Sequence, residues 1–322
     1  MPRSLITGIT GQAGSYLAEL LLKEGHEVFG LVRRSASPNY VRISGILDHI
    51  RLIVGDLSDE VSIRGAVKLV SPNFVFNAAA QSFVPTSLSQ PEYTMDVNAM
   101  GVLRLLEAIR SSVGDARFIQ FSSSEMFGAS PPPQHENTTF YPRSPYGISK
   151  MTAFWFVKNY RESYNMWAAN AILFNNEGPR RGEEFITQKI AIGVAKIKLG
   201  LEKKLYLGNL DARRDWGYCE DYMEAVYLLA KLEDPLDLII SSGESHFVRE
   251  FCEEAFSCVG LRAEDYVEVS PEFIRPAEVN YLQGDSSAFR RLTGWEPKKG
   301  FTEIVREMVM ASLSKLKSHQ TL

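Results

Sequence analysis

Tyr146 and Lys150 are the two residues whose types and spacing point most directly to chemistry. Residues four apart on a helix lie on the same face, so the Tyr-x-x-x-Lys spacing brings the phenol and the amine together. A lysine ammonium group beside a phenol stabilises the phenolate and lowers the phenol pKa from about 10. The tyrosine is then able to remove a hydroxyl proton while a hydride leaves the same carbon atom.

Ser123 and Glu125 follow the apolar run Phe118–Phe121, which we expect to be a strand. Ligands of an α/β sheet bind at the carboxyl ends of its strands, so both side chains are candidates for the site. A serine hydroxyl group there can hydrogen-bond a substrate oxygen atom, and a carboxylate can remove a second proton, such as one next to a new ketone. A simple reductase does not need that carboxylate. The alternative is that Glu125 caps the following turn.

Gly8, Gly11 and Gly14 form a GxxGxxG motif just before the helical pattern Ser15–Lys23. Glycines let the backbone turn tightly and approach a pyrophosphate, whose charge is held at the helix N-terminus. Gln12 lies inside the same turn and belongs to the predicted cofactor site. A purely structural turn is the alternative, but the position in the first strand–helix unit favours cofactor binding.

The residues that follow the next apolar runs indicate which dinucleotide is bound. Arg33 and Arg34 follow the second run, where an acidic residue would bind the ribose of NAD and an arginine accommodates the 2′-phosphate of NADP. We therefore expect NADP, with a solvated basic turn as the alternative. Asp56 and Leu57 follow the third run, where an adenine contact is expected, and Ala79 follows the fourth, where a small residue permits close approach. Packing alone is the alternative for these three.

The elements that must position these residues alternate along the first half of the chain. Short apolar runs are separated by helical patterns such as Val102–Arg110, which indicates a parallel sheet covered by helices on both faces. The predicted fold is therefore α/β, a doubly wound, Rossmann-type sheet with a smaller C-terminal substrate-binding lobe ending in the helix Phe301–Leu316. The dinucleotide-binding domain is predicted to comprise residues 1–173 and about 221–243. The substrate-binding lobe is predicted to comprise residues 174–220 and 244–322.

Composition argues against several other classes of protein. The 322 residues are 45% hydrophobic and 23% charged, as in ordinary globular proteins. A net charge of −4 argues against a nucleic-acid surface, which needs a basic excess. No apolar run approaches the roughly 20 residues that span a membrane, and the glycine turn comes too early for a signal peptide. The three cysteines lack metal-ligand spacing, so we expect reduced thiols, no metal and a cytoplasmic location.

Taken together, these motifs resemble the GDP-mannose 4,6-dehydratases, a family of the extended short-chain dehydrogenase/reductase superfamily. The likeness spans nearly the whole chain, and several of the matching stretches are specific to the family. They are Gly8–Gln12, Ala79–Ser82, Ser124–Gly128, Phe140–Tyr146, Asn159–Ser163, Pro179–Glu183, Leu207–Asp211, Arg214–Gly217 and Arg275–Val279.

The resemblance implies a reaction with no net redox change, carried out through bound NADP. Tyr146, assisted by Lys150, would deprotonate the C4 hydroxyl group of GDP-mannose. Glu125 would take the C5 proton and, with Ser123, help the C6 hydroxyl group to leave as water before the hydride returns to C6. The product would be GDP-4-keto-6-deoxy-D-mannose. The residues that would hold the GDP-linked hexose are Ser82, Asn175, Lys189, Arg214, Arg275 and Glu278.

Four positions depart from the family pattern. Ser123 stands in place of threonine, Ala13 in place of aspartate, and Asn176 and Gly178 in place of histidine and serine. Serine and glycine at 123 and 178 also resemble GDP-4-keto-6-deoxymannose reductases, so a ketoreductase or another GDP-sugar enzyme is the alternative function. A non-catalytic NADP-binding regulator is a third reading, but it has no need for the tyrosine, lysine and glutamate together. The family likeness implies a homodimer or homotetramer, in which Arg34 would reach a neighbour's cofactor.

Overall fold

A parallel sheet forms the centre of the molecule, which a computed structural model describes over residues 1–273 and 277–320. Its strands are β1 (Arg3–Thr7), β2 (Glu27–Val32), β3 (Ile50–Val54), β4 (Phe74–Asn77), β5 (Arg117–Ser123), β6 (Ala168–Leu173) and β11 (Leu238–Ile240). They pair in the order β11-β6-β5-β4-β1-β2-β3, and every pairing is parallel. The order reverses between β1 and β4, the switch point of a doubly wound sheet. The predicted fold class is therefore confirmed.

Helices cover both faces of this sheet because successive strand residues point to opposite sides. Along β1, Leu5 belongs to one buried cluster and Ile6 to the other, and Val75 and Phe76 divide in the same way along β4. Helices α1 (Gln12–Lys23) and α8 (Cys219–Ala230) cover one face, and α2 (Glu60–Val70), α5 (Gly101–Ser112) and α6 (Pro145–Tyr164) cover the other. Both faces of the sheet are therefore buried under helices.

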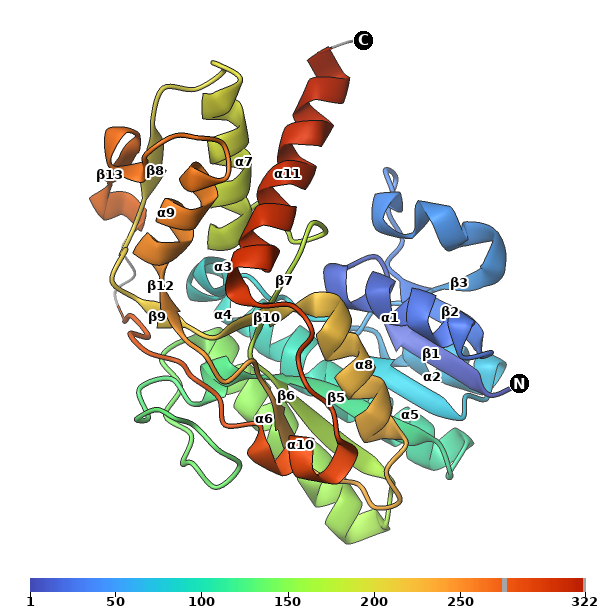
Figure 1. Ribbon diagram of the computed structural model, residues 1–322. Coiled ribbons are helices and arrows are strands. Elements are labelled where there is room, and N and C mark those ends of the chain that lie inside the picture. The colour runs from blue at the N-terminus through green and yellow to red at the C-terminus, as the bar shows by residue number, and fades with distance from the viewer. Residues whose placement is uncertain (274–276, 321–322) are drawn as a thin grey trace.

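A third buried cluster lies outside the sheet, among elements from the second half of the chain. Ile190, Phe251 and Met308 belong to it. They come from α7 (Ile186–Lys198), α9 (Val248–Ser257) and α11 (Phe301–Gln320), which lie together at the top of Figure 1. The end of α11 extends away from the body of the molecule, and the helix is longer than the predicted Phe301–Leu316.

Short strands and turns complete the described chain. Three two-stranded sheets pair β7 (Asn175–Glu177) with β10 (Trp216–Tyr218), β8 (Leu205–Leu207) with β13 (Val267–Val269), and β9 (Arg213–Arg214) with β12 (His246–Phe247). The short helices are η1 (Val41–His49), α3 (Val84–Ser89), α4 (Pro91–Met95), η2 (Asp96–Met100), η3 (Ser124–Met126), η4 (Ala263–Asp265), η5 (Pro271–Phe273) and α10 (Ser287–Thr293). Strand β7 follows β6 directly in the chain, and residues of both β7 and β10 line the cleft described below.

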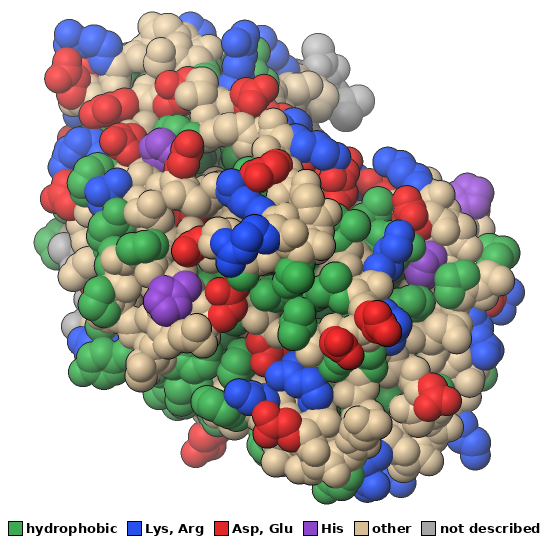
Figure 2. Space-filling model, turned by 60° about the horizontal axis from the view of Figure 1, so that its bottom comes forward, with side chains coloured by type: hydrophobic (Ala, Val, Ile, Leu, Met, Phe, Trp, Pro, Cys, Tyr) green, Lys and Arg blue, Asp and Glu red, His purple; other side chains and the backbone are tan. Residues whose placement is uncertain are grey.

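Basic and acidic side chains are interspersed over the face of the molecule shown in Figure 2. That face does not match the continuous basic surface of a protein that binds a nucleic-acid backbone. Within residues 1–273 and 277–320, no helix combines the length and apolar composition needed to cross a membrane.

Candidate active site

A cleft of about 1180 Å³ opens at the carboxyl ends of the sheet strands. Thr7, the last residue of β1, and Ser123, the last residue of β5, line it from the sheet. Lys189 and Glu278 line it from the second half of the chain. Sites for one small ligand usually hold about 300–1,000 Å³, so this cleft has room for more than one small molecule.

The glycine turn joins β1 to α1 at one end of the cleft. Gly8 has a positive φ of 69°, and a Cβ atom there would lie 2.8 Å from the Cα atom of Ala79. A Cβ atom on Gly14 would lie 2.3 Å from the carbonyl oxygen of Gly8. A side chain at either position would collide with backbone, so only glycine keeps this approach open. Gly11, at the N-cap of α1, has no side chain to occupy the first-turn N–H groups, which leaves them suited to an anion such as a pyrophosphate.

Of the residues predicted to contact the adenosine part of the cofactor, Arg33, Asp56 and Leu57 line the cleft and Arg34 does not. Arg33 lines the cleft and donates a hydrogen bond to the Tyr93 hydroxyl group at 3.1 Å. Asp56 and Leu57 line the cleft beyond the end of β3. Arg34 is exposed and is not one of the cleft-lining residues. The structure therefore places every predicted cofactor contact in the cleft except Arg34.

Tyr146 lies in the first turn of α6, the helix that the Tyr-x-x-x-Lys spacing predicts. The side chain of Ser144 caps this helix by accepting a hydrogen bond from the backbone N–H of Gly147 at 3.0 Å. Tyr146 and Lys150 are both buried. Burial raises the pKa of Tyr146 to about 12, against a smaller lowering by a hydrogen bond with Ser123.

The expected lowering of the Tyr146 pKa by Lys150 is wrong for this structure. The Lys150 amine donates a hydrogen bond to the carbonyl oxygen of Phe121 at 2.7 Å and lies 5.9 Å from the centre of the Tyr146 ring. Burial also lowers the pKa of the amine to about 8. Loss of hydration disfavours the charged form of each group and is the largest cause of both pKa shifts.

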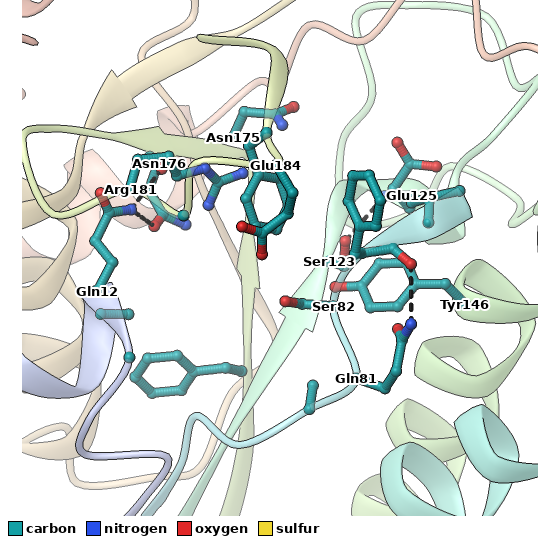
Figure 3. A pocket seen from close by; sticks show the side chains of 18 of the residues that line it. Gln12, Gln81, Ser82, Ser123, Glu125, Tyr146, Asn175, Asn176, Arg181 and Glu184 are labelled. Carbon is teal, nitrogen blue, oxygen red and sulfur yellow. Dashed lines mark hydrogen bonds between the residues drawn. The ribbon is translucent and has the colours of Figure 1, made fainter. Parts of the chain in front are cut away.

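Glu125 lies in the turn η3, directly after β5. Its backbone N–H donates to Ser123 Oγ at 3.2 Å, so Ser123 supplies the cap of this turn. Oxygen Oε2 of Glu125 is buried and has no hydrogen-bond partner within the described residues, and the same holds for Oδ1 of Asn175. Figure 3 shows both side chains at the cleft. Because buried polar atoms without partners are rare, two of them around one cleft indicate a ligand site.

The residues predicted to bind the sugar nucleotide lie around the same cleft. Those in the described chain all line it: Ser82, Asn175, Lys189, Arg214 and Glu278. Arg275 lies outside the described residues. Arg214 Nη2 and Glu278 Oε1 are 3.5 Å apart in a largely buried ion pair, and the Lys189 amine lies 3.5 Å from the centre of the Phe273 ring. Two cations therefore line a region able to bind a diphosphate.

Arg42 and Arg181 also line the cleft, although the sequence motifs assign them no role. Arg181 Nε lies 3.2 Å from Glu177 Oε2, and Thr187 donates a hydrogen bond to the same oxygen at 2.5 Å. Arg181 is shown in Figure 3 on the side of the cleft opposite Tyr146. Arg181 follows closely on the end of β7 and lies in the family-specific stretch Pro179–Glu183, which are signals that the sequence offers. Arg42 lies in η1, well after the end of β2, and no such signal marks it.

The parallel sheet, the glycine turn at its switch point and the buried Tyr146–Lys150 pair beside Ser123 define an extended short-chain dehydrogenase/reductase. The fold is similar to that of a UDP-glucose 4-epimerase from Thermus thermophilus in complex with NAD, with a TM-score of 0.83 and 28% identity, covering 96% of this chain and 98% of that one. It is also similar to a dTDP-glucose 4,6-dehydratase from Bacillus anthracis in complex with NAD, with a TM-score of 0.86 and 22% identity over 98% of both chains.

Within this class, the chain belongs to the GDP-mannose 4,6-dehydratase family. The family model described as GDP-mannose 4,6 dehydratase matches residues 5–308. The chain is 48% identical over 331 residues to GDP-mannose 4,6 dehydratase 1 from Arabidopsis thaliana, covering 99% of this chain and 92% of that protein. It is 44% identical over 344 residues to GDP-mannose 4,6 dehydratase from Homo sapiens, covering 98% and 92%. The predicted family is confirmed.

Proposed function

We propose that this protein converts GDP-D-mannose to GDP-4-keto-6-deoxy-D-mannose, as an NADP-dependent hydro-lyase. The observation that carries the proposal is the buried carboxylate oxygen of Glu125, which has no hydrogen-bond partner among the described residues. This carboxylate lies near enough to Tyr146 to raise the pKa of the phenol. A reductase needs one group that exchanges a proton, whereas the loss of water from C5 and C6 needs a second. Membership of the family and the names of the relatives support the same reaction.

The cofactor we propose is NADP, and the residues at the glycine turn fit it. Gly8 and Gly14 let the turn pack against backbone atoms with which a Cβ atom would collide, and Gly11 provides no side-chain cap for the N-terminus of α1. Arg33 and Arg42 bring two guanidinium groups to this part of the cleft, where an acidic residue would favour NAD. NADP bound there would supply the acceptor for a hydride from C4 of the sugar and the donor that returns it at C6.

The catalytic roles we propose follow from the position of each group. Tyr146 takes the proton of the C4 hydroxyl group, with Ser123 hydrogen-bonded beside it. The charge of Arg181 favours the phenolate and partly offsets the effect of burial, which raises the pKa of Tyr146 to about 12. Lys150, whose amine lies 5.9 Å from the centre of the Tyr146 ring, holds a second cationic group near it when protonated. Glu125 takes the proton from C5, next to the new ketone, and with Ser123 helps the C6 hydroxyl group to leave as water. The two protons taken by Tyr146 and Glu125 are both given back, one to the departing water and one to C5, and with the hydride at C6 they complete the product.

The second half of the chain supplies the groups that we propose hold the sugar nucleotide. Lys189 and Arg214 suit the two phosphoryl groups, since a guanidinium fork and an ammonium group both bind phosphate oxygens. Asn175, with its unpaired Oδ1, and Ser82 suit sugar hydroxyl groups, and Glu278 suits a donor such as the guanine ring or a hydroxyl group.

We also propose that the protein forms a homodimer or homotetramer. Met100, in η2, and Ile148 and Trp155, in α6, are exposed apolar side chains on two elements that pack together. Exposed apolar side chains on two packed elements offer a surface that a second copy would cover. Analytical ultracentrifugation tests this proposal, and a monomer at micromolar concentration would exclude it.

The two-domain division expected from the sequence is likewise a proposal. It is supported by the separate buried cluster around Phe251, which shares none of its members with the two clusters on the faces of the sheet. Hydrogen exchange under native conditions tests it, because separate domains open with different free energies. A single opening free energy for all three clusters would contradict the division.

The experiment that tests the function is an incubation of the purified protein with GDP-mannose and a catalytic amount of NADP, followed by mass spectrometry. The expected product has lost one water, and no NADPH accumulates. The variant Glu125→Gln should form none of this product. If GDP-mannose is untouched and a 4-keto-6-deoxy sugar nucleotide is reduced while NADPH is consumed, the ketoreductase function replaces the dehydratase. Inertness toward both substrates would contradict both.

A further inference from the structure

Residues 175–185 form a segment, here called the bridging segment, that joins the two sides of the cleft. Gln12 lies in the glycine turn, at the start of α1, and Asn176 lies in β7. The Gln12 side-chain amide donates to the backbone oxygen of Asn176 at 2.9 Å and to its side-chain oxygen at 3.2 Å. Dashed lines in Figure 3 mark these bonds. The helix that opens the dinucleotide site is therefore tied to the segment that carries Arg181 into the cleft.

Arg180 anchors the same segment to α1 from outside the cleft. Its guanidinium group donates to Ser15 Oγ at 3.1 Å and to Glu19 Oε1 at 2.7 Å. The guanidinium carbon also lies 4.2 Å from the centre of the Tyr16 ring. All three partners belong to α1, and the Arg180 and Glu19 side chains are only 26% and 29% exposed. An ion pair that is partly shielded, bonded twice and stacked on an aromatic ring holds its geometry far better than an exposed pair.

Arg42, in η1, contacts both the bridging segment and the glycine turn. Its Nε donates to the backbone oxygen of Arg180 at 2.7 Å, and its Nη1 reaches the backbone oxygen of Thr10, in the glycine turn, at 3.5 Å. Thr10, Arg42 and Arg181 all line the cleft, whereas Arg180 does not. Arg180 therefore acts on the cleft only through its neighbours in the bridging segment.

We propose that Arg180 is a positioning residue that holds the bridging segment across the dinucleotide site and slows the release of NADP. This inference rests on the proposed cofactor and deepens the proposed function. A reaction that takes a hydride from the substrate and gives it back to the same molecule regenerates its cofactor in place. Slow release then does not limit turnover, whereas a reductase must exchange its oxidised cofactor in every cycle. Slow release of NADP caused by Arg180 therefore suits an enzyme that regenerates its cofactor in place.

The rate of NADPH release tests the positioning role of Arg180 and does not depend on catalytic activity. Holoenzyme loaded with NADPH is mixed with excess NADP in a stopped-flow instrument, and the loss of protein-enhanced NADPH fluorescence gives the dissociation rate. Arg180→Ala should release NADPH about tenfold faster or more, the change expected when a charge-assisted hydrogen bond is lost. Glu19→Gln, a milder change of similar shape, should act in the same direction with a smaller effect. The upward shift of Tm that NADP produces should shrink in both variants.

The matched control is Arg161→Ala, which removes a partly buried ion pair with Asp237 away from the cleft. It should lower the Tm of the cofactor-free protein but leave the NADPH dissociation rate at the wild-type value. A wild-type dissociation rate in Arg180→Ala, or an equal acceleration in Arg180→Ala and Arg161→Ala, would overturn the proposal. If the wild-type protein binds NADPH but does not dehydrate GDP-mannose, the proposed function fails while the release rates still decide the role of Arg180. Wild-type protein that binds no nicotinamide dinucleotide would overturn both.

Discussion

Two sides of the cleft are suited to ligand binding by different properties of their residues. One side carries the glycine turn, and the other carries Lys189 and Arg214. At the glycine turn, the important property of Gly8 and Gly14 is the absence of a side chain, because a Cβ atom at either would collide with backbone. On the other side, the important property is the presence of charge. Lys189 and Arg214 are brought there by α7 and β9, elements from the second half of the chain.

The two sides also differ in how their residues are held together. The glycine turn is one continuous stretch of chain between β1 and α1. Arg214 pairs instead with Glu278, which is 64 residues away, and Lys189 lies against the ring of Phe273. Ligand binding at the glycine turn should therefore be weakened by adding side-chain atoms, and binding at Lys189 and Arg214 by removing their charged groups. Tyr146 lines the cleft from α6, and at this residue the loss of a single oxygen atom should be enough to stop catalysis.

The largest expected effect is that of Tyr146→Phe, which removes the proposed base and leaves both sides of the cleft intact. Loss of a general base typically lowers kcat by about a thousandfold. The dissociation constants for NADP and for GDP-mannose should change little, and both can be measured by calorimetry. A variant that keeps more than about a tenth of the wild-type kcat would remove Tyr146 from the mechanism.

Adding one carbon atom at the glycine turn should have the next largest effect. Gly14→Ala places a Cβ atom 2.3 Å from the carbonyl oxygen of Gly8, so the turn must shift. Overpacking of this kind costs about 1–3 kcal/mol of unfolding free energy, and the shifted turn should weaken NADP binding. The control is Gly65→Ala, in α2, where the added atom meets nothing within 4 Å. That change should stabilise the protein by about 0.5–1 kcal/mol. Equal NADP affinity in both variants would contradict a role for the turn in binding.

Removing a charge from the other side should affect the substrate and not the cofactor. Arg214→Met keeps much of the side-chain volume and loses the guanidinium group, so the KM for GDP-mannose should rise about tenfold. The dissociation constant for NADP should be unchanged. A fall in NADP affinity of the same size would show that the two sides of the cleft are not separate binding surfaces.

The smallest expected effect is a pH dependence caused by Lys150. Burial lowers the pKa of this amine from 10.5 to about 8, so the folded protein binds fewer protons than the unfolded chain between these values. The unfolding free energy should therefore rise with pH across that window. If the ammonium group supports Tyr146, kcat/KM should fall over the same range, because the charge is lost as the pH passes about 8.

The control for this pH dependence is Lys150→Met, which removes the titrating group. Chemical denaturation of the two proteins from about pH 7 to about pH 10.5 should give curves whose difference changes steadily above about pH 8. Parallel curves would show that Lys150 is not titrating with a lowered pKa.

Much of the fold and part of the site could be predicted because the signals are local. The strands of the first half are short apolar runs between turn residues, and the structure has them at the expected places. Gly8, Gly14 and the Tyr146–Lys150 spacing each lie within one turn or one helix, so a few neighbouring residues are enough to identify them. The predicted helix Phe301–Leu316 is shorter than the observed α11, which ends at Gln320, because helix ends depend on the packing of the final turns.

The features that could not be predicted depend on contacts between distant segments. Arg180 looks like any loop arginine until α1 brings Glu19 and Tyr16 against it. The Tyr146 pKa was expected to fall because Lys150 lies one helical turn away, yet it rises because the phenol is buried. The depth of burial belongs to the packed layers and not to the spacing of two residues.

The sequence by itself determined the doubly wound sheet, the glycine turn and the family, because periodicity and short motifs are properties of contiguous residues. Only the tertiary structure decided which charges line the cleft, which carboxylate oxygen is left without a partner, and which arginine ties the two sides of the cleft together. The physical reason is that burial and pairing are set by residues far apart in the chain, and their free energies depend on the surroundings that only folding creates.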